Sequence, residues 1–232
     1  EAGMKYALLT SKHHDGFCLW PSKYTEYSAK NSPLDKDLMG LFTEEFRRAG
    51  LKTGFYYSLW DRNYPHYEED EVYAEFMKNQ LTELLTQYGE MVEIWFDGAW
   101  DKDNPNREWE YDPRWEKDPD SGLMRGERWH WKEIYDHVHR LQPDCLIANN
   151  VCSDRSGEVR YFPVDLRTAE RFNFVHKGKL VTPRLDSIFE DEKGEKVFLP
   201  LEYDETLQPD WFCIESGYFT HPSAETIIGW YN

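Results

Sequence analysis

The stretch Glu90-Met-Val-Glu-Ile-Trp-Phe-Asp-Gly-Ala-Trp100 decides how the rest of the chain is interpreted. Residues 91–96 are apolar, β-branched and aromatic, and a glycine precedes and follows them, which predicts a short buried strand. Asp97 ends this strand directly before Gly98, so its carboxylate is expected on rigid backbone at the rim of a sheet. In α/β barrels that rim carries the chemistry. The alternative is that Asp97 caps the following turn, as aspartate often does.

Strand and helix patterns alternate on both sides of this stretch. Residues 5–10, 52–58 and 144–149 have the composition of buried strands, and amphipathic patterns predict helices over residues 35–50, 71–88 and 131–141. This alternation implies parallel βα units. Residues 100–128 are charged, rich in Pro and Trp and without periodicity, which predicts a long loop on the active face. We therefore expect an α/β fold, (β/α)-barrel-like, with residues 1–232 forming one catalytic domain.

The apolar faces of the first two helices can be assigned from spacing. The helix over residues 35–50 is expected to begin at Asp35 or Asp37 and to end at Gly50. Its predicted buried stripe consists of Leu38, Leu41, Phe42 and Phe46. The predicted buried stripe of the helix over residues 71–88 consists of Val72, Phe76, Leu84 and Leu85.

The composition excludes several classes of partner. The chain has 232 residues and a formal net charge of −17, which repels nucleic acid and anionic membrane surfaces. No apolar run approaches the roughly 20 residues of a membrane span, so we expect a soluble protein. Aromatic residues make up 16% of the chain, and sugar-binding clefts use such rings. Cys18, Cys145, Cys152 and Cys213 include no CxxC pair, so we expect reduced thiols rather than a zinc site or a disulfide scaffold.

Two adjacent histidines, His13 and His14, follow the first strand and precede Asp15-Gly16. Neighbouring residues of an extended chain point to opposite faces, so both rings can face the same way only if the backbone bends, which Gly16 would permit. The pair could hydrogen bond a polar substrate, form a structural turn, or ligate a metal. A metal would need a third ligand, and neither HxH nor HExxH spacing is present.

Polar residues follow each predicted strand: His13-His14, Tyr56-Tyr57, Asp97 and Asn149-Asn150. The carboxyl ends of parallel strands meet at one edge of the sheet. Several strand ends converging on one face is how a (β/α) barrel assembles a catalytic site.

Several of these segments resemble the α-L-fucosidase family, glycoside hydrolase family 29. The segments KHHDGFCLWPS (12–22), GFYYSLWD (54–61) and EIWFDGAW (93–100) are similar to successive strand-end motifs of that family, and LQPDCLIANN and LPLEYDETLQPDWF to later ones. The resemblance implies a retaining exo-glycosidase on a (β/α)-type barrel that needs no metal or other cofactor. Its substrate would be a fucosylated oligosaccharide or glycoside, and Asp97 would be the nucleophile. The implied sugar contacts are His13, His14, Tyr56 with Tyr57 as the alternative, Trp60, Arg160 and Trp211.

The second carboxylate of that mechanism departs from the family pattern. Counting from Arg160 places Asp165 where the family has its acid/base glutamate, and Glu170 lies a short distance further on. Glu202 is a third candidate. Asp165 or Glu170 could instead be an ion-pair partner of a neighbouring arginine, so the assignment stays open here.

The family's barrel has strands before the histidine pair and one after the end of this sequence, so we expect an incomplete or distorted barrel. Unpaired strand edges favour association, which predicts a homo-oligomer. No signal peptide is visible, and the compartment is left open with the cytoplasm favoured. Three alternatives remain: a galactosidase-like exo-glycosidase, a carbohydrate-binding remnant without catalysis, and a metal-dependent hydrolase.

Overall fold

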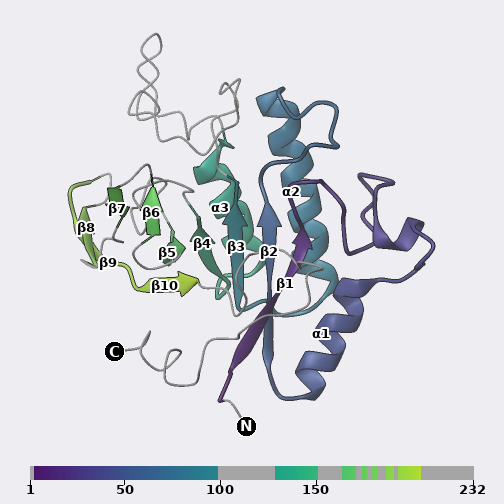
Figure 1. Cartoon of the computed structure of the whole chain (residues 1–232), viewed down its shortest axis with the longest axis horizontal. Coiled ribbons are helices and arrows are strands. Elements are labelled where there is room, and N and C mark those ends of the chain that lie inside the picture. The colour runs from purple at the N-terminus through teal and green to yellow at the C-terminus, as the bar shows by residue number, and fades with distance from the viewer. Residues whose placement is uncertain are drawn as a thin grey trace.

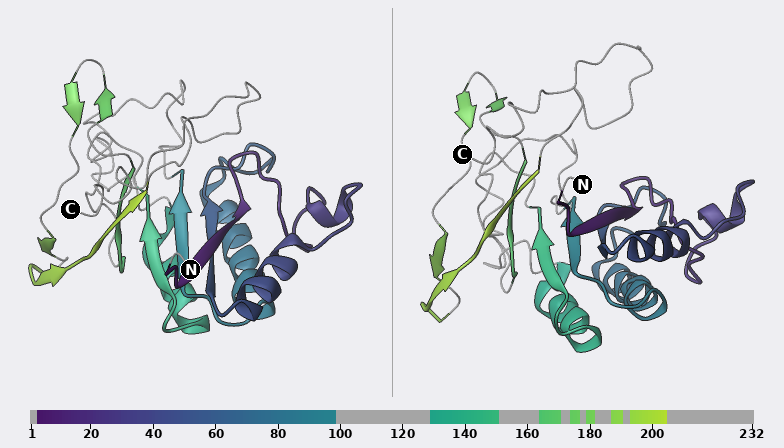
Figure 2. Two further views of the ribbon diagram at one scale, coloured as in Figure 1. Left: turned by 60° about the horizontal axis from the view of Figure 1, so that its bottom comes forward. Right: turned by 90° about the horizontal axis from the view of Figure 1, so that it is seen from below.

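The computed structural model describes residues 3–98, 129–150, 164–170, 174–176, 179–181, 187–190 and 193–204. Its centre is a parallel sheet of four strands in sequence order, with a helix on each connection between neighbours. The three helices lie together on one face of this sheet (Figures 1 and 2). The elements are β1 (Tyr6–Lys12), α1 (Leu38–Arg48), β2 (Lys52–Ser58), α2 (Asp70–Gln87), β3 (Glu93–Asp97), α3 (Trp131–Leu141) and β4 (Leu146–Asn149).

Shorter elements continue from the far side of β4. A parallel bridge between Ala148 and Leu166 sets β5 (Arg167–Glu170) beside β4, and β10 (Leu201–Asp204) pairs in parallel with β5. The parallel βα units expected from the sequence are confirmed. The described strands do not close into a barrel. In the chain between β5 and β10 there are two antiparallel pairs, β6 (Phe174–His176) with β7 (Lys179–Val181) and β8 (Ile188–Glu190) with β9 (Lys196–Phe198). A short 3-10 helix, η1 (Ala29–Asn31), precedes α1.

Alternation along β3 separates the core from the site. Ile94 and Phe96 are fully buried in the hydrophobic core, where the Phe96 ring contacts the Trp131 ring of α3. Trp95 points to the opposite face, where its ring stacks on that of Tyr56 with centroids 5.6 Å apart. Because alternate residues of a strand share a face, Asp97 lies on the same side as Trp95.

The boundaries of α1 follow the expected capping. The Asp37 carboxylate accepts a hydrogen bond from the Gly40 N–H at 2.9 Å, so Asp37 rather than Asp35 is the cap. Gly50 follows the helix with φ +81°, a backbone conformation that glycine adopts without strain.

The predicted buried stripes of both helices were wrong in part. On α1, Met39 and Thr43 are buried, whereas Leu41 is 47% exposed. On α2, Val72 is 42% exposed, whereas Phe76, Leu84 and Leu85 are buried as predicted. The true face of α2 also includes Tyr73, Met77, Gln80 and Leu81, whose spacing turns Val72 outward. None of the described helices combines the length and apolar character needed to cross a membrane.

Candidate active site

Asp97 lies at the carboxyl end of β3 with its carboxylate held by two donors. The Tyr56 hydroxyl donates to Oδ2 at 2.5 Å, and the Asn150 side-chain amide donates to Oδ1 at 3.1 Å. The side chain of Asp97 is 10% exposed. These two hydrogen bonds fix the direction of the carboxylate.

Strand register explains why these residues meet. Ser58 pairs with Asp97 and Tyr56 with Trp95 across β2 and β3, and Asn149 pairs with Phe96 across β3 and β4. Tyr56 is therefore level with Trp95, two residues before Asp97, and its side chain is long enough to extend along the strand direction to the carboxylate.

The backbone bends after His13, which is the condition under which both adjacent rings can face the same way. The Gly16 N–H donates to the His13 carbonyl at 3.0 Å, and Gly16 has φ +81°. The His13 ring stacks on the Tyr56 ring with centroids 5.5 Å apart, and the His14 ring lies 4.0 Å from that of His13. Both imidazoles are therefore on the same side as Asp97.

The hydrogen bonds of Ser58 fix the proton on His14. The Ser58 hydroxyl donates to the Trp60 carbonyl at 2.7 Å, so its oxygen accepts at 2.7 Å from Nδ1 of His14. Burial lowers the pKa of His14 to about 4, although Asp97 acts in the opposite direction. At neutral pH the ring is the neutral Nδ1–H tautomer, and its Nε2 is an acceptor 3.6 Å from Oδ2 of Asp97. Burial also lowers the pKa of His13.

Gly98 allows this close packing. Its φ is +76°, and a Cβ there would lie 3.2 Å from Cβ of Trp60 and 3.3 Å from Cε1 of His14. The centres of the Trp60 and His14 rings are 5.3 Å apart. The Arg62 guanidinium lies over the face of the Trp60 ring, 4.1 Å from the centre of that ring. The loop after β2 thus forms one wall around Asp97.

Tyr57 does not belong to this group, and its inclusion as the alternative to Tyr56 is corrected. It faces the helices, is fully buried, and donates its hydroxyl to Gln80 at 2.7 Å. Successive residues of β2 alternate between faces, so only one of the two tyrosines can reach Asp97.

Asp165 does not lie with Asp97 either. Its carboxylate accepts from the Ile147 N–H at 2.8 Å and lies 3.2 Å from Nε2 of His139. Ile147 pairs with Ile94, three residues before Asp97, which is about 10 Å along the strand at about 3.3 Å per residue. Retaining glycosidases hold their two carboxyl groups about 5–5.5 Å apart, so this position does not fit the predicted acid/base.

Glu202 also lies away from Asp97. Its carboxyl hydrogen bonds that of Glu93, at the opposite end of β3, and Tyr6 hydrogen bonds Glu93 as well. Burial and the neighbouring Glu202 carboxyl raise the pKa of Glu93 well above its usual range. Burial and the same two glutamates raise the pKa of Tyr6 to about 12.

Glu170 occupies a different position, at the carboxyl end of β5. The Thr168 hydroxyl lies 3.2 Å from Oδ1 of Asn150, the residue whose amide holds Asp97. Position 170 is two residues beyond Thr168 in the same strand, so it shares its face of the sheet. Arg160, Trp211 and the loop over residues 100–128 lie outside the described residues.

Within the part of the chain that the structure describes, no group of three or more His, Cys, Asp or Glu side chains is arranged to hold a metal ion. The histidine pair instead contacts aromatic rings, Ser58 and Asp97.

Comparison with known proteins decides the family. The family model described as Alpha-L-fucosidase matches residues 1–224. The chain belongs to the alpha-L-fucosidase family. It is 33% identical over its whole length to Alpha-L-fucosidase 1 from Arabidopsis thaliana.

Solved structures agree with this membership. Alpha-L-fucosidase isoenzyme 1 from Paenibacillus thiaminolyticus has 28% identity and a TM-score of 0.66 over 98% of this chain. A glycoside hydrolase 29 family member from an unknown rumen bacterium has 32% identity and a TM-score of 0.61 over 92% of it. The chain spans 42% of the Arabidopsis protein, 51% of the Paenibacillus chain and 37% of the rumen one.

Two residues of this site, Ser58 and Thr168, were missed from the sequence, which placed Asn150 among the polar strand ends but gave it no separate role. Asn150 and Thr168 continue from Asp97 as a line of polar contacts, and Ser58 sets the tautomer of His14. For Ser58 the available signal was position, because it ends a predicted strand, where polar side chains gather. Thr168 carried no such signal because the sequence did not predict β5.

Proposed function

We propose that this chain forms the catalytic (β/α)-barrel-type domain of a retaining exo-glycosidase that hydrolyses terminal α-L-fucose from glycosides. The observation that carries the proposal is the setting of Asp97. Its carboxylate is fixed by Tyr56 and Asn150 at a strand end beside two imidazoles. Membership in the alpha-L-fucosidase family supports the same activity and names fucose as the sugar.

In the first step Asp97 is the nucleophile. One of its oxygens attacks the anomeric carbon, the bond from that carbon to the leaving oxygen breaks, and a covalent glycosyl-enzyme forms. The hydrogen bonds from Tyr56 and Asn150 hold the carboxylate in one orientation, so little reorganisation is needed during attack.

The proposed acid/base is Glu170. It gives a proton to the leaving oxygen in the first step and takes one from the attacking water in the second, so the sugar is released with its original configuration. Its register position beyond Thr168, at the same edge of the sheet as Asp97, supports this role. The carboxylates of Asp165 and Glu202 are engaged away from Asp97, which favours Glu170 over both.

The sugar is proposed to lie against His13, His14 and Trp60. As the Nδ1–H tautomer, His14 can accept a hydrogen bond from a sugar hydroxyl at Nε2. The ring of Trp60 supplies an apolar face for the carbon skeleton. Contacts from Arg160 and Trp211 stay predictions.

A panel of nitrophenyl glycosides tests this function. We expect nitrophenol release from the α-L-fucoside alone, at a rate that a chelator does not change. Equal release from a galactoside would favour the galactosidase-like alternative, inhibition by chelator the metal-dependent one, and binding without release the carbohydrate-binding one.

Self-association also stays a proposal. Light scattering coupled to size exclusion at low micromolar concentration tests it, and we expect the mass of a homo-oligomer. An active monomer would contradict the expectation.

A further inference from the structure

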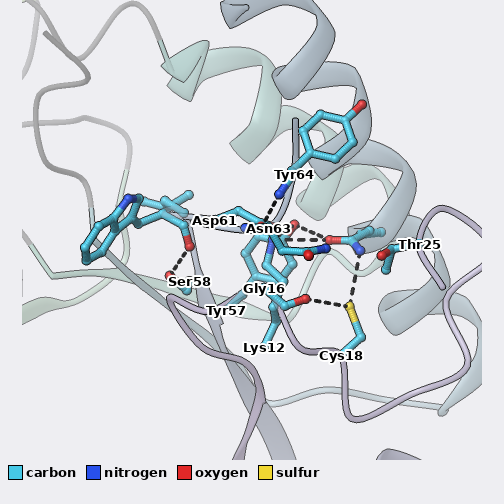
Figure 3. A network of polar contacts seen from close by, with 12 residues as sticks. Lys12, Gly16, Cys18, Thr25, Tyr57, Ser58, Asp61, Asn63 and Tyr64 are labelled. Atoms are coloured by element: carbon cyan, nitrogen blue, oxygen red, sulfur yellow. Dashed lines mark hydrogen bonds and ion pairs between the residues drawn. The ribbon is translucent and has the colours of Figure 1, made fainter. Parts of the chain in front are cut away.

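A buried ion pair lies directly behind the histidine turn. Lys12 is fully buried and Asp61 is 3% exposed, and Nζ of Lys12 lies 3.1 Å from Oδ2 of Asp61 (Figure 3). Nζ also donates to the Tyr57 hydroxyl at 3.0 Å and lies 4.2 Å from the centre of that ring. Longer contacts reach Gln80 Oε1 at 3.3 Å and the Tyr73 hydroxyl at 3.4 Å.

An irregularity in β1 turns Lys12 towards these partners. Thr10 pairs with Tyr56 and Lys12 with Tyr57, so two steps along β1 match a single step along β2. Without this bulge, Lys12 would be paired with Ser58, on the face that carries Asp97. The extra residue directs Lys12 to the helix face and His13 to the site face.

The other oxygen of Asp61 organises the loop after β2. Oδ1 accepts from the Asn63 and Tyr64 N–H groups, each at 2.9 Å (Figure 3). A Cβ on Gly16 would lie 2.2 Å from this oxygen, so the histidine turn packs directly against Asp61. The Arg62 N–H donates to the His14 carbonyl at 3.0 Å. Asp61 therefore joins the strand end, the histidine turn and the loop that carries Trp60.

We propose that Lys12 and Asp61 are positioning residues, whose ion pair holds the His13–Gly16 turn against the loop after β2 so that both imidazoles face Asp97. The assignment of the imidazoles to substrate rests on the proposed function; the structural link between the ion pair and the turn does not. Neither charged group touches the reacting atoms, so the role acts through His13 and His14.

The chemistry of the pair supports a positioning role. Burying two charges is costly, and apolar side chains of similar volume would often fill the same space at equal or better stability. An ion pair with directed hydrogen bonds, in contrast, allows one arrangement. Both tyrosine hydroxyls donate elsewhere, Tyr57 to Gln80 and Tyr73 to the Leu59 carbonyl, so both accept from Lys12 and the network has a single direction.

The test compares Lys12→Met with the double variant Lys12→Met/Asp61→Asn in the full chain. The double variant leaves no unpaired buried charge, and its new amide side chain retains an oxygen for the loop N–H groups. It therefore covers the case in which the single variant fails to fold. Ile134→Ala, in the core on α3, is the control for lowered stability without a change in either loop.

The first readout is the nitrogen NMR spectrum of His14, assigned with His14→Gln. In the wild type we expect the Nδ1–H tautomer and a titration midpoint near 4. In both Lys12 variants, mixed tautomers and a midpoint moved towards 6.5 are expected, because the turn opens to water. Asp97, His13, Arg62 and Asp15 are the titratable and charged groups that act on His14, and none of them is substituted in either variant.

The second readout is kinetic. The Lys12 variants should lose on the order of 10²-fold in kcat/KM for nitrophenyl fucoside, since small displacements of positioning groups have effects of that size. Ile134→Ala should keep the wild-type spectrum and kinetics. A folded Lys12 variant with the wild-type His14 spectrum would overturn the inference. A wild type without fucoside hydrolysis would overturn the proposed function alone, because the NMR readout needs no activity.

Discussion

The hydroxyl of Tyr56 lies 2.5 Å from Oδ2 of Asp97, across the register of β2 and β3. This contact joins the best-placed carboxylate of the described chain to the ring on which His13 stacks. If Asp97 attacks the sugar, loss of the contact should lower the rate of hydrolysis and leave the fold unchanged.

Tyr56→Phe should therefore lower kcat. A hydrogen bond to a charged group contributes about 1.5–3 kcal/mol, which corresponds to roughly 10- to 100-fold in rate. Steady-state kinetics on nitrophenyl fucoside measure it. Tyr24→Phe, at an exposed tyrosine outside the site, is the matched control and should leave kcat unchanged. Equal kcat in the two variants would show that Tyr56 does not orient Asp97.

Gly98 offers a test of crowding at the site. Gly98→Ala and Gly50→Ala both place a side chain at positive φ, +76° and +81°, and each should lose about 1–2 kcal/mol of unfolding free energy. Only the Cβ at Gly98 would press on Trp60 and His14, since nothing lies within 4 Å of one at Gly50. Gly98→Ala should therefore also lose activity. Urea unfolding and kinetics on both variants check this, and equal activity would contradict the packing described.

The lowered pKa of His14 predicts a pH dependence of stability. Its neutral form is favoured in the folded state, so its contribution is present above its ordinary pKa of 6.5 and is lost as pH falls to about 4. That difference corresponds to about 3 kcal/mol at about 1.36 kcal/mol per pKa unit. The unfolding free energy of His14→Gln should vary less over this range than that of the wild type. His13, whose pKa is also lowered, is common to both proteins. Parallel pH curves would count against the burial of His14.

Glu170 and Asp165 can be separated by leaving group. Glu170→Gln should impair substrates with poor leaving groups far more than activated aryl fucosides, because only the former need protonation. Asp165→Asn should lower stability, since it weakens contacts to His139 and the Ile147 N–H, and should show no such contrast. Rates on an aryl and an alkyl fucoside give the comparison. A contrast in Asp165→Asn instead would reverse the assignment.

Much of the frame was predictable because it depends on local patterns. The strand over residues 52–58 and the helix over residues 131–141 have the predicted bounds, and Asp97 ends its strand as expected. The bend at His13 is the condition under which two adjacent rings turn to one side. Each of these features is set by residues close together in the sequence.

The errors came from contacts that local patterns do not contain. Tyr56 and Tyr57 are adjacent residues of the same type, and only the register of β2 against β3 decides which of them contacts Asp97. Lysine is almost never fully buried without a partner, and the partner of Lys12, Asp61, lies 49 residues away in the sequence, so no local pattern places Lys12 in the core. Asp165 matched a spacing, but its carboxylate is engaged by the edge of β4.

The most direct test of the account is the chemistry of Asp97 itself. Asp97→Asn is nearly isosteric and should keep the fold while abolishing turnover of an α-L-fucoside. Asp97→Ala leaves room for a small anion, so added azide should restore turnover by attacking the anomeric carbon in place of the carboxylate. The product, identified by NMR, should be the β-fucosyl azide, of inverted configuration. Near wild-type hydrolysis by Asp97→Asn, or an azide product of retained configuration, would contradict the assignment of Asp97 as the nucleophile.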